Sequence, residues 1–538
     1  MSASREKQNR QAANRQADPK TAREAQQRRE EKRANLLYGV IAAAVVLAVI
    51  VSLVWRSNLI PRMSTAATID GEKYTASEVS YYYQSAYRNF AANSQYSYFL
   101  SYLGLNTGAS LKNQEISAST ASMLGLDIPG VDLQAAGDEE APVSTGVTWH
   151  DYFLDRALDN MSVIQSVLKT AEAEGFEYPA GVQAQYDDRM AALKADAAAS
   201  GLSVSQYLSA SFGAGVTEKV YGEQLMRVLR YSAYVDAYQK GLAYSDSELE
   251  EAYNADRNSY DRVSYEVVTF SGAAESTTGD DGSTVEPTEQ ESAEALNAAN
   301  EKAGAVISGY KDGESLEDLA GEYEGTYNKN ENATYSAGSQ LSEWLFTHGQ
   351  EDGDTAVVTD GTTVYAVLFH QRFREETPTI DIRHILVPLG SGAVAQGEEG
   401  YEDEQAQLKA DAHAKAEELL GQWQSGEATE ASFAALAMKE STDGSKYDGG
   451  LYTEVYQGQM VETFNDWCFE PSRQSGDTGV VDTQYGSHVM YFSGVNHLKR
   501  WQSQVAEALR SEAYAALEDS LTENVTVQRF ESGLKFVG

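Results

Sequence analysis

The 538-residue sequence has a single cysteine, Cys468, which excludes disulfide frameworks, paired-cysteine redox centres and cysteine-based metal sites within one chain. Cys468 closes a helical pattern, so we expect a buried structural thiol. Basic residues are also scarce, because 41 lysines and arginines stand against 81 aspartates and glutamates, a net charge of −40. This balance argues against a nucleic-acid partner. It suits a self-repelling surface that either favours basic clients or serves solubility alone.

Charged side chains are missing altogether from Leu36 to Trp55, a run of twenty residues. As a helix, this run would span a hydrocarbon core of about 30 Å. A basic tail without apolar periodicity, residues 1–35, precedes it and is expected to be disordered and cytoplasmic. The run is longer than the apolar part of a cleaved signal peptide. We therefore expect an uncleaved single-pass anchor in the cell membrane, with the rest of the chain outside.

The part after this run begins with signals for a short hairpin and a capped helix. Residues 66–74 contain an Asp70-Gly71 turn between short apolar segments, which is typical of a hairpin. Thr75 and Glu78 have the spacing of a capping box, and we expect a helix from Glu78 onward.

The length of the chain predicts three or four domains. Helical periodicity dominates residues 62–260, which we expect to form a mainly helical domain. Within it, residues 93–145 are rich in Ser, Gly and Asn and are expected to be a flexible insertion. Residues 498–538 begin as a further helix, and we expect them to return and complete the helical domain.

An internal repeat organises the second half of the chain. Each copy opens with a strand that is followed by a polar loop and a long helix. We therefore expect two tandem α+β domains of one fold, at residues 261–375 and 378–496. In each copy a tryptophan stands nine positions before a Gly-Asp-Thr turn: Trp344 and Gly353 in the first copy, Trp467 and Gly476 in the second.

Two histidines distinguish the copies. His384 and His488 lie on the bounding strands of the second copy, where the first copy has Val267 and Tyr365. A scaffold that is kept while its polar centre is lost indicates a structural or client-binding first copy. Taken singly, a strand histidine is more often a satisfied core residue than a functional one, so the interpretation depends on joint spacing.

Several motifs of the second copy resemble, in the same order, those of parvulin-type (rotamase) peptidyl-prolyl isomerases. The surrounding plan more weakly resembles extracytoplasmic foldases of the PrsA, SurA and PpiD type, in which a parvulin domain sits inside a helical chaperone domain. The motifs are the strand Arg383-His384-Ile385-Leu386-Val387, the loop Ser441-Thr442-Asp443-Gly444-Ser445 with Gly449-Gly450-Leu451, the segment Gly458-Gln459-Met460 with Phe464, and the strand Tyr485-Gly486-Ser487-His488-Val489.

The resemblance implies a peptidyl-prolyl cis-trans isomerase site in the second copy. It implies a hydrogen-bonded catalytic cluster of His384, His488, Asp443 and Thr483, and an apolar proline pocket of Leu451, Met460 and Phe464, the last two on one helix. No cofactor or metal is expected, because isomerisation breaks no bond. The sequence Gly449-Gly450-Leu451-Tyr452 departs from the family, whose loop carries an acid there and is one residue longer.

Three functions remain open on the sequence. The first is a membrane-anchored isomerase and chaperone that assists the folding of exported polypeptides with X–Pro bonds, with a homodimer allowed by analogy. The second is a non-catalytic holdase in which both copies bind clients. The third is a cell-surface adhesion or scaffold protein with one folded partner. Residue by residue, the simpler interpretations also stand: Met460 and Phe464 as core residues, and Asp443 as a turn former.

Overall fold

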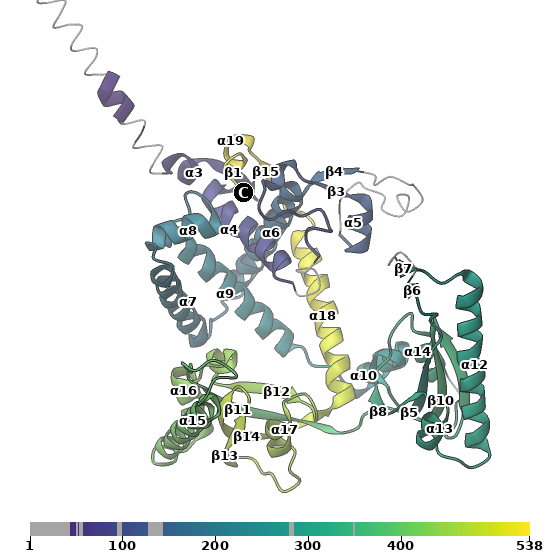
Figure 1. Cartoon of the computed structure of the whole chain (residues 1–538). Helices are drawn as coiled ribbons and strands as arrows, with labels where there is room; N and C mark the ends of the chain where they lie inside the picture. The colour runs from purple at the N-terminus through teal and green to yellow at the C-terminus, as the bar shows by residue number, and fades with distance from the viewer. Residues whose placement is uncertain are drawn as a thin grey trace, which may run out of the picture. The chain divides into compact units, whose positions relative to one another are not determined.

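The computed structural model describes residues 44–49, 52, 58–93, 99–126, 128, 144–278, 284–347 and 350–538 (Figure 1). The basic tail and most of the predicted anchor lie outside these ranges. Within them, no helix is long and apolar enough to cross a membrane. The chain divides into two compact units. The first comprises the chain up to Phe176, Tyr186–Tyr231 and Glu518–Gly538; the second comprises Glu177–Gln185 and Ser232–Leu517.

The first unit starts with the predicted hairpin, which is confirmed. Strands β1 (Thr65–Ile69) and β2 (Glu72–Thr75) pair antiparallel around Asp70 and Gly71, both at positive φ, as a tight two-residue hairpin turn requires. The predicted capping box of Thr75 and Glu78 is present and begins α4 (Ala76–Ala91), two residues earlier than expected. The C-terminal strand β15 (Val527–Arg529) pairs with β1, so the predicted return holds for Glu518–Gly538, whereas residues 498–517 belong to the second unit.

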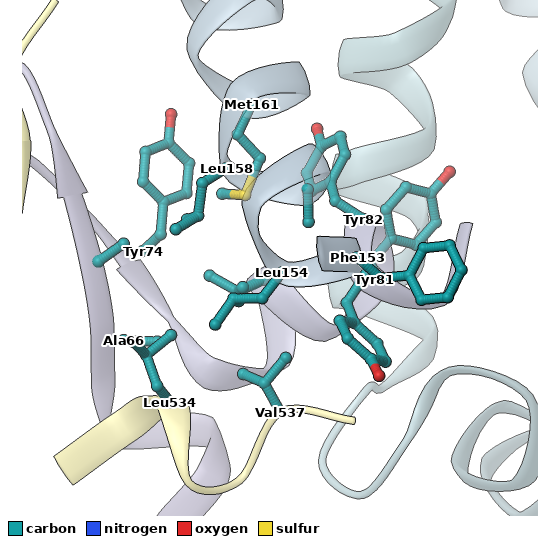
Figure 2. Close-up of a cluster of buried hydrophobic side chains, with 14 of the residues drawn as sticks. Ala66, Tyr74, Tyr81, Tyr82, Phe153, Leu154, Leu158, Met161, Leu534 and Val537 are labelled. Carbon is teal, nitrogen blue, oxygen red and sulfur yellow. The ribbon is translucent and has the colours of Figure 1, made fainter. Parts of the chain in front are cut away.

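An aromatic core fills the first unit (Figure 2). Tyr83 on α4 meets Phe153 on α6 (Trp149–Ala173) edge-on at 6.4 Å, and Met161 on α6 and Val537 near the end of the chain belong to the same cluster. The helical character predicted for this region is confirmed. Further helices that lie wholly or partly in the unit include α3 (Leu59–Met63), α7 (Ala180–Ala199), α8 (Val204–Phe212), α9 (Glu218–Gly241) and α19 (Glu531–Leu534).

The segment expected to be a flexible insertion has regular structure where it is described, so that prediction is wrong for residues 99–126. Leu105 and Ile116 are fully buried and belong to the aromatic core. The polar composition hid these few anchoring apolar residues. The elements of the segment are η1 (Leu111–Asn113), β3 (Glu115–Ser117), α5 (Ala118–Met123) and β4 (Ser144–Thr148), with β3 and β4 paired antiparallel.

The second unit contains two four-stranded antiparallel sheets with the same connectivity, which confirms the internal repeat and the α+β class. The strand order is β8-β5-β10-β9 in the first copy and β12-β11-β14-β13 in the second. The edge strands β8 and β12 were not predicted.

The elements of the first copy are β5 (Arg262–Ser271), β6 (Thr277–Thr278), β7 (Thr284–Val285), α12 (Glu289–Lys311), α13 (Leu316–Glu322), β8 (Thr326–Ala333), α14 (Gln340–Leu345), β9 (Thr355–Asp360) and β10 (Thr363–Phe373). Those of the second are β11 (Pro378–Pro388), α15 (Tyr401–Gln424), α16 (Glu430–Glu440), η3 (Gly444–Asp448), β12 (Leu451–Val455), α17 (Glu462–Cys468), β13 (Thr478–Thr483) and β14 (Gly486–Lys499).

Each sheet separates two small cores, because side chains alternate between its faces. In the second copy, Ile385 and Val489 face α15 and α16, whereas Ile382 and Met490 face α17. Cys468, the last residue of α17, is buried in the latter core, as predicted, and burial raises the pKa of its thiol to about 12. The histidines share the face of Ile382 and Met490.

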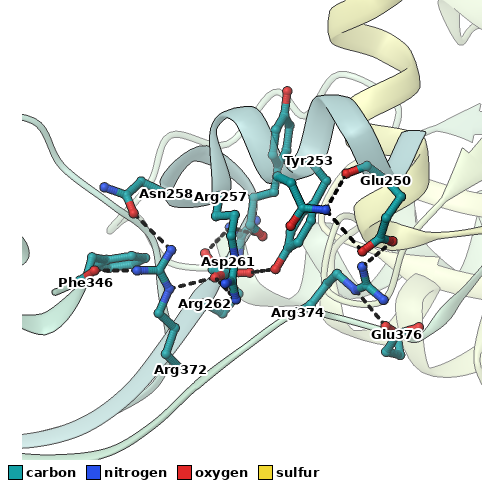
Figure 3. A network of polar contacts seen from close by, with 12 residues as sticks. Glu250, Tyr253, Arg257, Asn258, Asp261, Arg262, Phe346, Arg372, Arg374 and Glu376 are labelled. Carbon is teal, nitrogen blue, oxygen red and sulfur yellow. Dashed lines mark hydrogen bonds and ion pairs between the residues drawn. The ribbon is translucent and has the colours of Figure 1, made fainter. Parts of the chain in front are cut away.

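A polar network ties the first copy to the helices that precede it (Figure 3). The carboxylate of Asp261 is almost fully buried and binds the Arg372 guanidinium at 2.6 Å and the Tyr253 hydroxyl. Arg374, in the linker between the copies, binds Glu250 at 2.7 Å and Glu376 at 2.8 Å. The remaining helices of this region are α10 (Asp246–Ala255), which begins with a capping box of Ser245 and Glu248, α11 (Arg257–Tyr260) and α18 (Arg500–Thr522).

Candidate active site

Two antiparallel strands bring the histidines together. In the β11–β14 register Leu386 lies opposite His488 and His384 opposite Met490, so the two histidines are diagonal neighbours on one face. Their Nδ1 atoms are 3.0 Å apart and their rings are stacked at 5.2 Å. Both side chains are buried, with 2% and 5% exposure. The structure thus places them face to face on neighbouring strands, as expected.

Asp443 reaches the first of these histidines. It is the N-cap of η3, and its Oδ1 lies 3.2 Å from Nε2 of His384. The same oxygen accepts hydrogen bonds from the Ser445 amide at 2.8 Å and the Ser445 hydroxyl at 2.5 Å. The shortened loop that follows Asp443 therefore leaves the carboxylate within reach of the imidazole.

Thr483 reaches the second histidine from the end of β13. Its hydroxyl oxygen lies 2.9 Å from Nε2 of His488 and accepts a hydrogen bond from the Tyr485 amide at 3.1 Å. The four predicted catalytic residues are thus in one place, in the spatial order Asp443, His384, His488, Thr483.

This order defines one consistent set of donors and acceptors. The Asp443 carboxylate can only accept, so His384 donates from Nε2 and, when neutral, accepts at Nδ1. His488 then donates from Nδ1 and accepts at Nε2 from the Thr483 hydroxyl. The cluster is a single chain of hydrogen bonds that runs from the Asp443 carboxylate through both imidazoles to the Thr483 hydroxyl.

The electrostatics of the cluster agree with a neutral His488 and an ionised Asp443. Burial, and then the neighbouring His384, lower the pKa of His488 to about 4, because charging a buried ring is unfavourable. The hydrogen bond from His384 holds the pKa of Asp443 well below its usual range; bonds from Ser445 add to this effect and burial opposes it. At pH 7 the cluster therefore holds an ionised Asp443 at its outer end and a neutral His488 ring.

An apolar wall lies against the histidines. Phe464, a buried residue of α17, meets both rings edge-on, at 5.5 Å from His384 and 5.2 Å from His488. Met460 packs against the same core. The prediction that both residues share a helix is wrong, because α17 begins at Glu462 and Met460 lies in the turn before it.

Tyr452, not Leu451, completes the cluster on β12. Its ring stacks on His384 at 5.2 Å and its hydroxyl donates to Oδ1 of Asp443 at 3.1 Å. Burial and then the charge of Asp443 raise the pKa of its phenol to about 12. Leu451 lies opposite Arg383 in the β11–β12 register, and neighbouring strand residues face opposite sides, so it points away from the histidines. The signal in the sequence that could have identified Tyr452 is its position directly after Leu451, in the loop that differs from the family pattern.

A cavity of about 570 Å³ opens beside Thr483, a volume within the usual range for ligand sites. Asp482 at its wall binds the hydroxyl of Ser487 at 2.6 Å and the ring of His413 at 2.9 Å. Burial by itself would raise the pKa of Asp482, but these two hydrogen bonds lower it overall. Val461, Thr463 and Lys409 also line the cavity, so both polar and apolar groups are available to a chain segment next to the cluster.

The first copy shows what the same fold contains without the histidines. Val267 and Tyr365 occupy the places of His384 and His488, because the register Thr269–Tyr365 corresponds to Leu386–His488. They belong to an apolar cluster with residues of α14. His370 in this copy is bound instead to Glu266 at 3.0 Å and to Asp352 at 3.3 Å.

The other histidines that the structure describes lie outside the cluster. His150 is buried with its Nδ1 3.1 Å from the Tyr83 hydroxyl, and His413 is paired with Asp482. His497 is exposed, and His348 lies outside the described residues.

Comparison with known proteins shows to which class of domain this site belongs. Residues 368–494 match the family model of the PPIC-type PPIase domain, so this part of the chain is a parvulin-type peptidyl-prolyl cis-trans isomerase domain. The match includes all the site residues above. It begins ten residues before the predicted boundary at 378, in the last strand of the first copy. A search of curated proteins found no match.

Solved structures with detectable similarity include PrsA proteins. The peptidylprolyl isomerase PrsA of Bacillus anthracis is 22% identical over 28% of this chain and 58% of its own, with a TM-score of 0.17. PrsA of Bacillus subtilis is 13% identical over 72% and 91% of the two chains, with a TM-score of 0.27. A structure described with two SurA-like chaperones of Campylobacter jejuni is 12% identical over 86% and 96%, with a TM-score of 0.12.

Proposed function

We propose that the protein is a membrane-anchored, extracytoplasmic peptidyl-prolyl cis-trans isomerase and chaperone that assists the folding of exported polypeptides. The observation that carries the isomerase is the hydrogen-bonded chain from Asp443 through His384 and His488 to Thr483, which lies against an apolar wall in a PPIC-type domain. Its substrate is an X–Pro bond in an unfolded or partly folded client, and it needs no cofactor.

Rotation about an X–Pro bond crosses a barrier of about 18–20 kcal/mol, because the twisted amide loses its resonance. The site contributes surfaces rather than a nucleophile. The proline ring would lie against Met460 and Phe464, with Tyr452 as a side wall. The buried imidazoles and the apolar wall keep water away from the amide, and this low-polarity environment favours the less polar twisted state. Asp443 orients the chain by fixing the tautomer of His384.

The proposed location is supported by the sequence. An uncharged run over residues 36–55 follows a basic tail over residues 1–35, which is the pattern of an anchor with a cytoplasmic N-terminus. In intact cells, a protease added from outside should digest the part after Arg56, once any outer membrane has been permeabilised, and leave the tail protected. Protection of the whole chain under these conditions would contradict the proposed orientation.

The isomerase is tested on the full chain with a proline-containing peptide and a reporter protease. The protease cleaves only the trans form of the peptide, so the cleavage rate reports the conversion of cis to trans. We expect His488→Ala and Met460→Ala to lower kcat/KM at least tenfold. His370→Ala is the matched control, because it removes a bound strand histidine from the first copy and should leave the rate unchanged. A wild-type rate at the uncatalysed background would contradict the enzymatic function.

A second function, a holdase, is favoured by the first copy. Its sheet face keeps the partly buried Tyr265 and Tyr365 in the place of the histidine cluster, and α14 adds the partly buried Trp344. Suppression of aggregation of an unfolded test protein should then survive His488→Ala and decrease in Trp344→Ala. If His488→Ala abolishes both activities together, the holdase is not a separate function.

A further inference from the structure

Strand β12, which carries Tyr452, contains a bulge. In the β11–β12 register, Ile380 pairs with Val455 and Ile382 pairs with Tyr452, so two steps on β11 correspond to three on β12. Residues three apart on a regular strand face opposite sides of the sheet. The extra residue allows Tyr452 and Val455 to join the same core, together with Ile380 and Ile382. The bulge therefore decides that Tyr452 faces the histidines.

Glu454 gives the bulge its shape. Its φ is +55°, in the left-handed region that residues with a Cβ disfavour, and it is one of five non-glycine residues with positive φ in the described part of the chain. Such a conformation persists only where surrounding contacts enforce it. The backbone amide of Glu454 donates to Oδ1 of Asp381 at 2.9 Å, which fixes the inner side of the bulge.

The outer side of the bulge is fixed from outside the isomerase domain. Both carboxylate oxygens of Glu454 bind the guanidinium of Arg510, at 2.9 and 3.2 Å, and one also accepts from the Ser503 hydroxyl at 2.7 Å. Arg510 and Ser503 are on α18, beyond residue 494, where the family match ends. The Glu454 and Arg510 side chains are 19% and 21% exposed, so this paired geometry is better shielded from solvent than a surface ion pair.

The first copy provides an internal comparison. Its β5–β8 register has the same jump, because Val263 pairs with Ala333 and Tyr265 with Asn330. Asn332 stands in the place of Glu454, has no positive φ, and is bonded within its own strand through Asn330. The first copy, which lacks the His384–His488 pair, thus keeps the bulge without a positive φ, whereas the second copy has the strained form that is held by α18.

We infer that Glu454, Arg510 and Ser503 are positioning residues of the isomerase site: α18 clamps the β12 bulge, and the clamped bulge aims Tyr452 at His384 and Asp443. This inference rests on the proposed isomerase activity. The clamp acts through Tyr452, whose ring stacks on His384 and whose hydroxyl binds the carboxylate of Asp443.

The test uses the full chain and the peptide isomerisation assay. Arg510→Ala and Glu454→Gln should each lower kcat about tenfold with little change in KM. A displaced Tyr452 disturbs the alignment of the bound peptide in the transition state more than it weakens the binding of the peptide. The double variant should be no worse than either single variant. Arg510→Lys retains one contact and should recover part of the rate. In NMR spectra, we expect the side-chain signals of His384 to shift in Arg510→Ala in the same direction as in Tyr452→Phe.

A matched control separates positioning from general destabilisation. Arg372→Ala removes an arginine of similar exposure, 16%, from an ion pair in the first copy, and should lower thermal stability but leave kcat unchanged. If Arg372→Ala and Arg510→Ala lower kcat in proportion to their loss of stability, the positioning role is refuted. If the wild-type protein is active and Arg510→Ala and Glu454→Gln have unchanged kcat, the positioning role of α18 is refuted but the isomerase activity stands. If the wild-type protein is inactive, the isomerase activity itself is refuted.

Discussion

Lowering the pH should weaken the second α+β copy through one identifiable group, His488. In the folded chain the pKa of His488 is lowered to about 4, mainly by burial, whereas an exposed histidine in the unfolded chain titrates near 6.5. Between these values the unfolded state binds the proton and the folded state does not. The neutral ring therefore contributes stability that is complete above about pH 6.5 and is lost as the pH falls toward 4.

The difference between the two pKa values corresponds to about 3 kcal/mol, since one pKa unit is worth about 1.4 kcal/mol. His488→Gln lacks this contribution while keeping a polar side chain of similar length. The stability difference between wild type and His488→Gln should thus shrink by about 3 kcal/mol between pH 7 and pH 4. Carboxylates that titrate in the same pH range contribute equally to both proteins, so their contributions cancel in this stability difference.

The measurement is a urea titration of the full chain, followed through NMR signals of the second copy at several pH values. A direct titration of histidine-labelled protein complements it. His413 serves as the opposite case in the same domain, because its hydrogen bond with Asp482 raises its pKa above the ordinary value. If His488 titrates near 6.5, or if the stability difference does not depend on pH, the buried neutral chain of hydrogen bonds is refuted.

Three substitutions near the cluster give further tests. Phe464→Ala should lower the free energy of unfolding by about 3–5 kcal/mol, because the ring is buried, and should raise KM for the peptide. Hydrogen exchange of the second copy measures the loss of stability, and unchanged protection of its amides would contradict the packing of Phe464. Tyr452→Phe removes one hydrogen bond to Asp443, so kcat should fall while stability changes by only about 1 kcal/mol in thermal unfolding. Gly450→Ala should cost about 3 kcal/mol or more, because φ is +75° and the new Cβ would lie 2.3 Å from the His384 carbonyl oxygen; a soluble variant with wild-type melting would overturn this account.

Local signals in the sequence were sufficient for much of the fold. The Asp70-Gly71 turn and the Thr75–Glu78 capping box predicted a hairpin and a helix start that the structure contains. Both depend only on residues within four positions of each other. The tandem repeat was equally readable, because equal spacing of Trp and Gly-Asp-Thr motifs reflects one connectivity used twice.

Local signals failed where a few buried contacts outweigh composition. Residues 99–126 are polar enough to predict a flexible segment, but Leu105 and Ile116 secure them to the core. The helical spacing of Met460 and Phe464 was likewise misleading, since α17 starts two residues after Met460. In both cases the decisive partners come from distant parts of the chain and leave no periodic trace.

For the site, the sequence by itself determined which residue types were available: two strand histidines, an acid in a Ser-Thr-Asp-Gly-Ser turn, and an aromatic residue after Gly-Gln-Met. Only the tertiary structure decided that Asp443 meets His384 at 3.2 Å and that Tyr452 replaces Leu451 beside the ring. The physical reason is that the facing of a strand residue depends on register. Here one bulge at Glu454, held by Arg510 more than fifty residues away, sets that register.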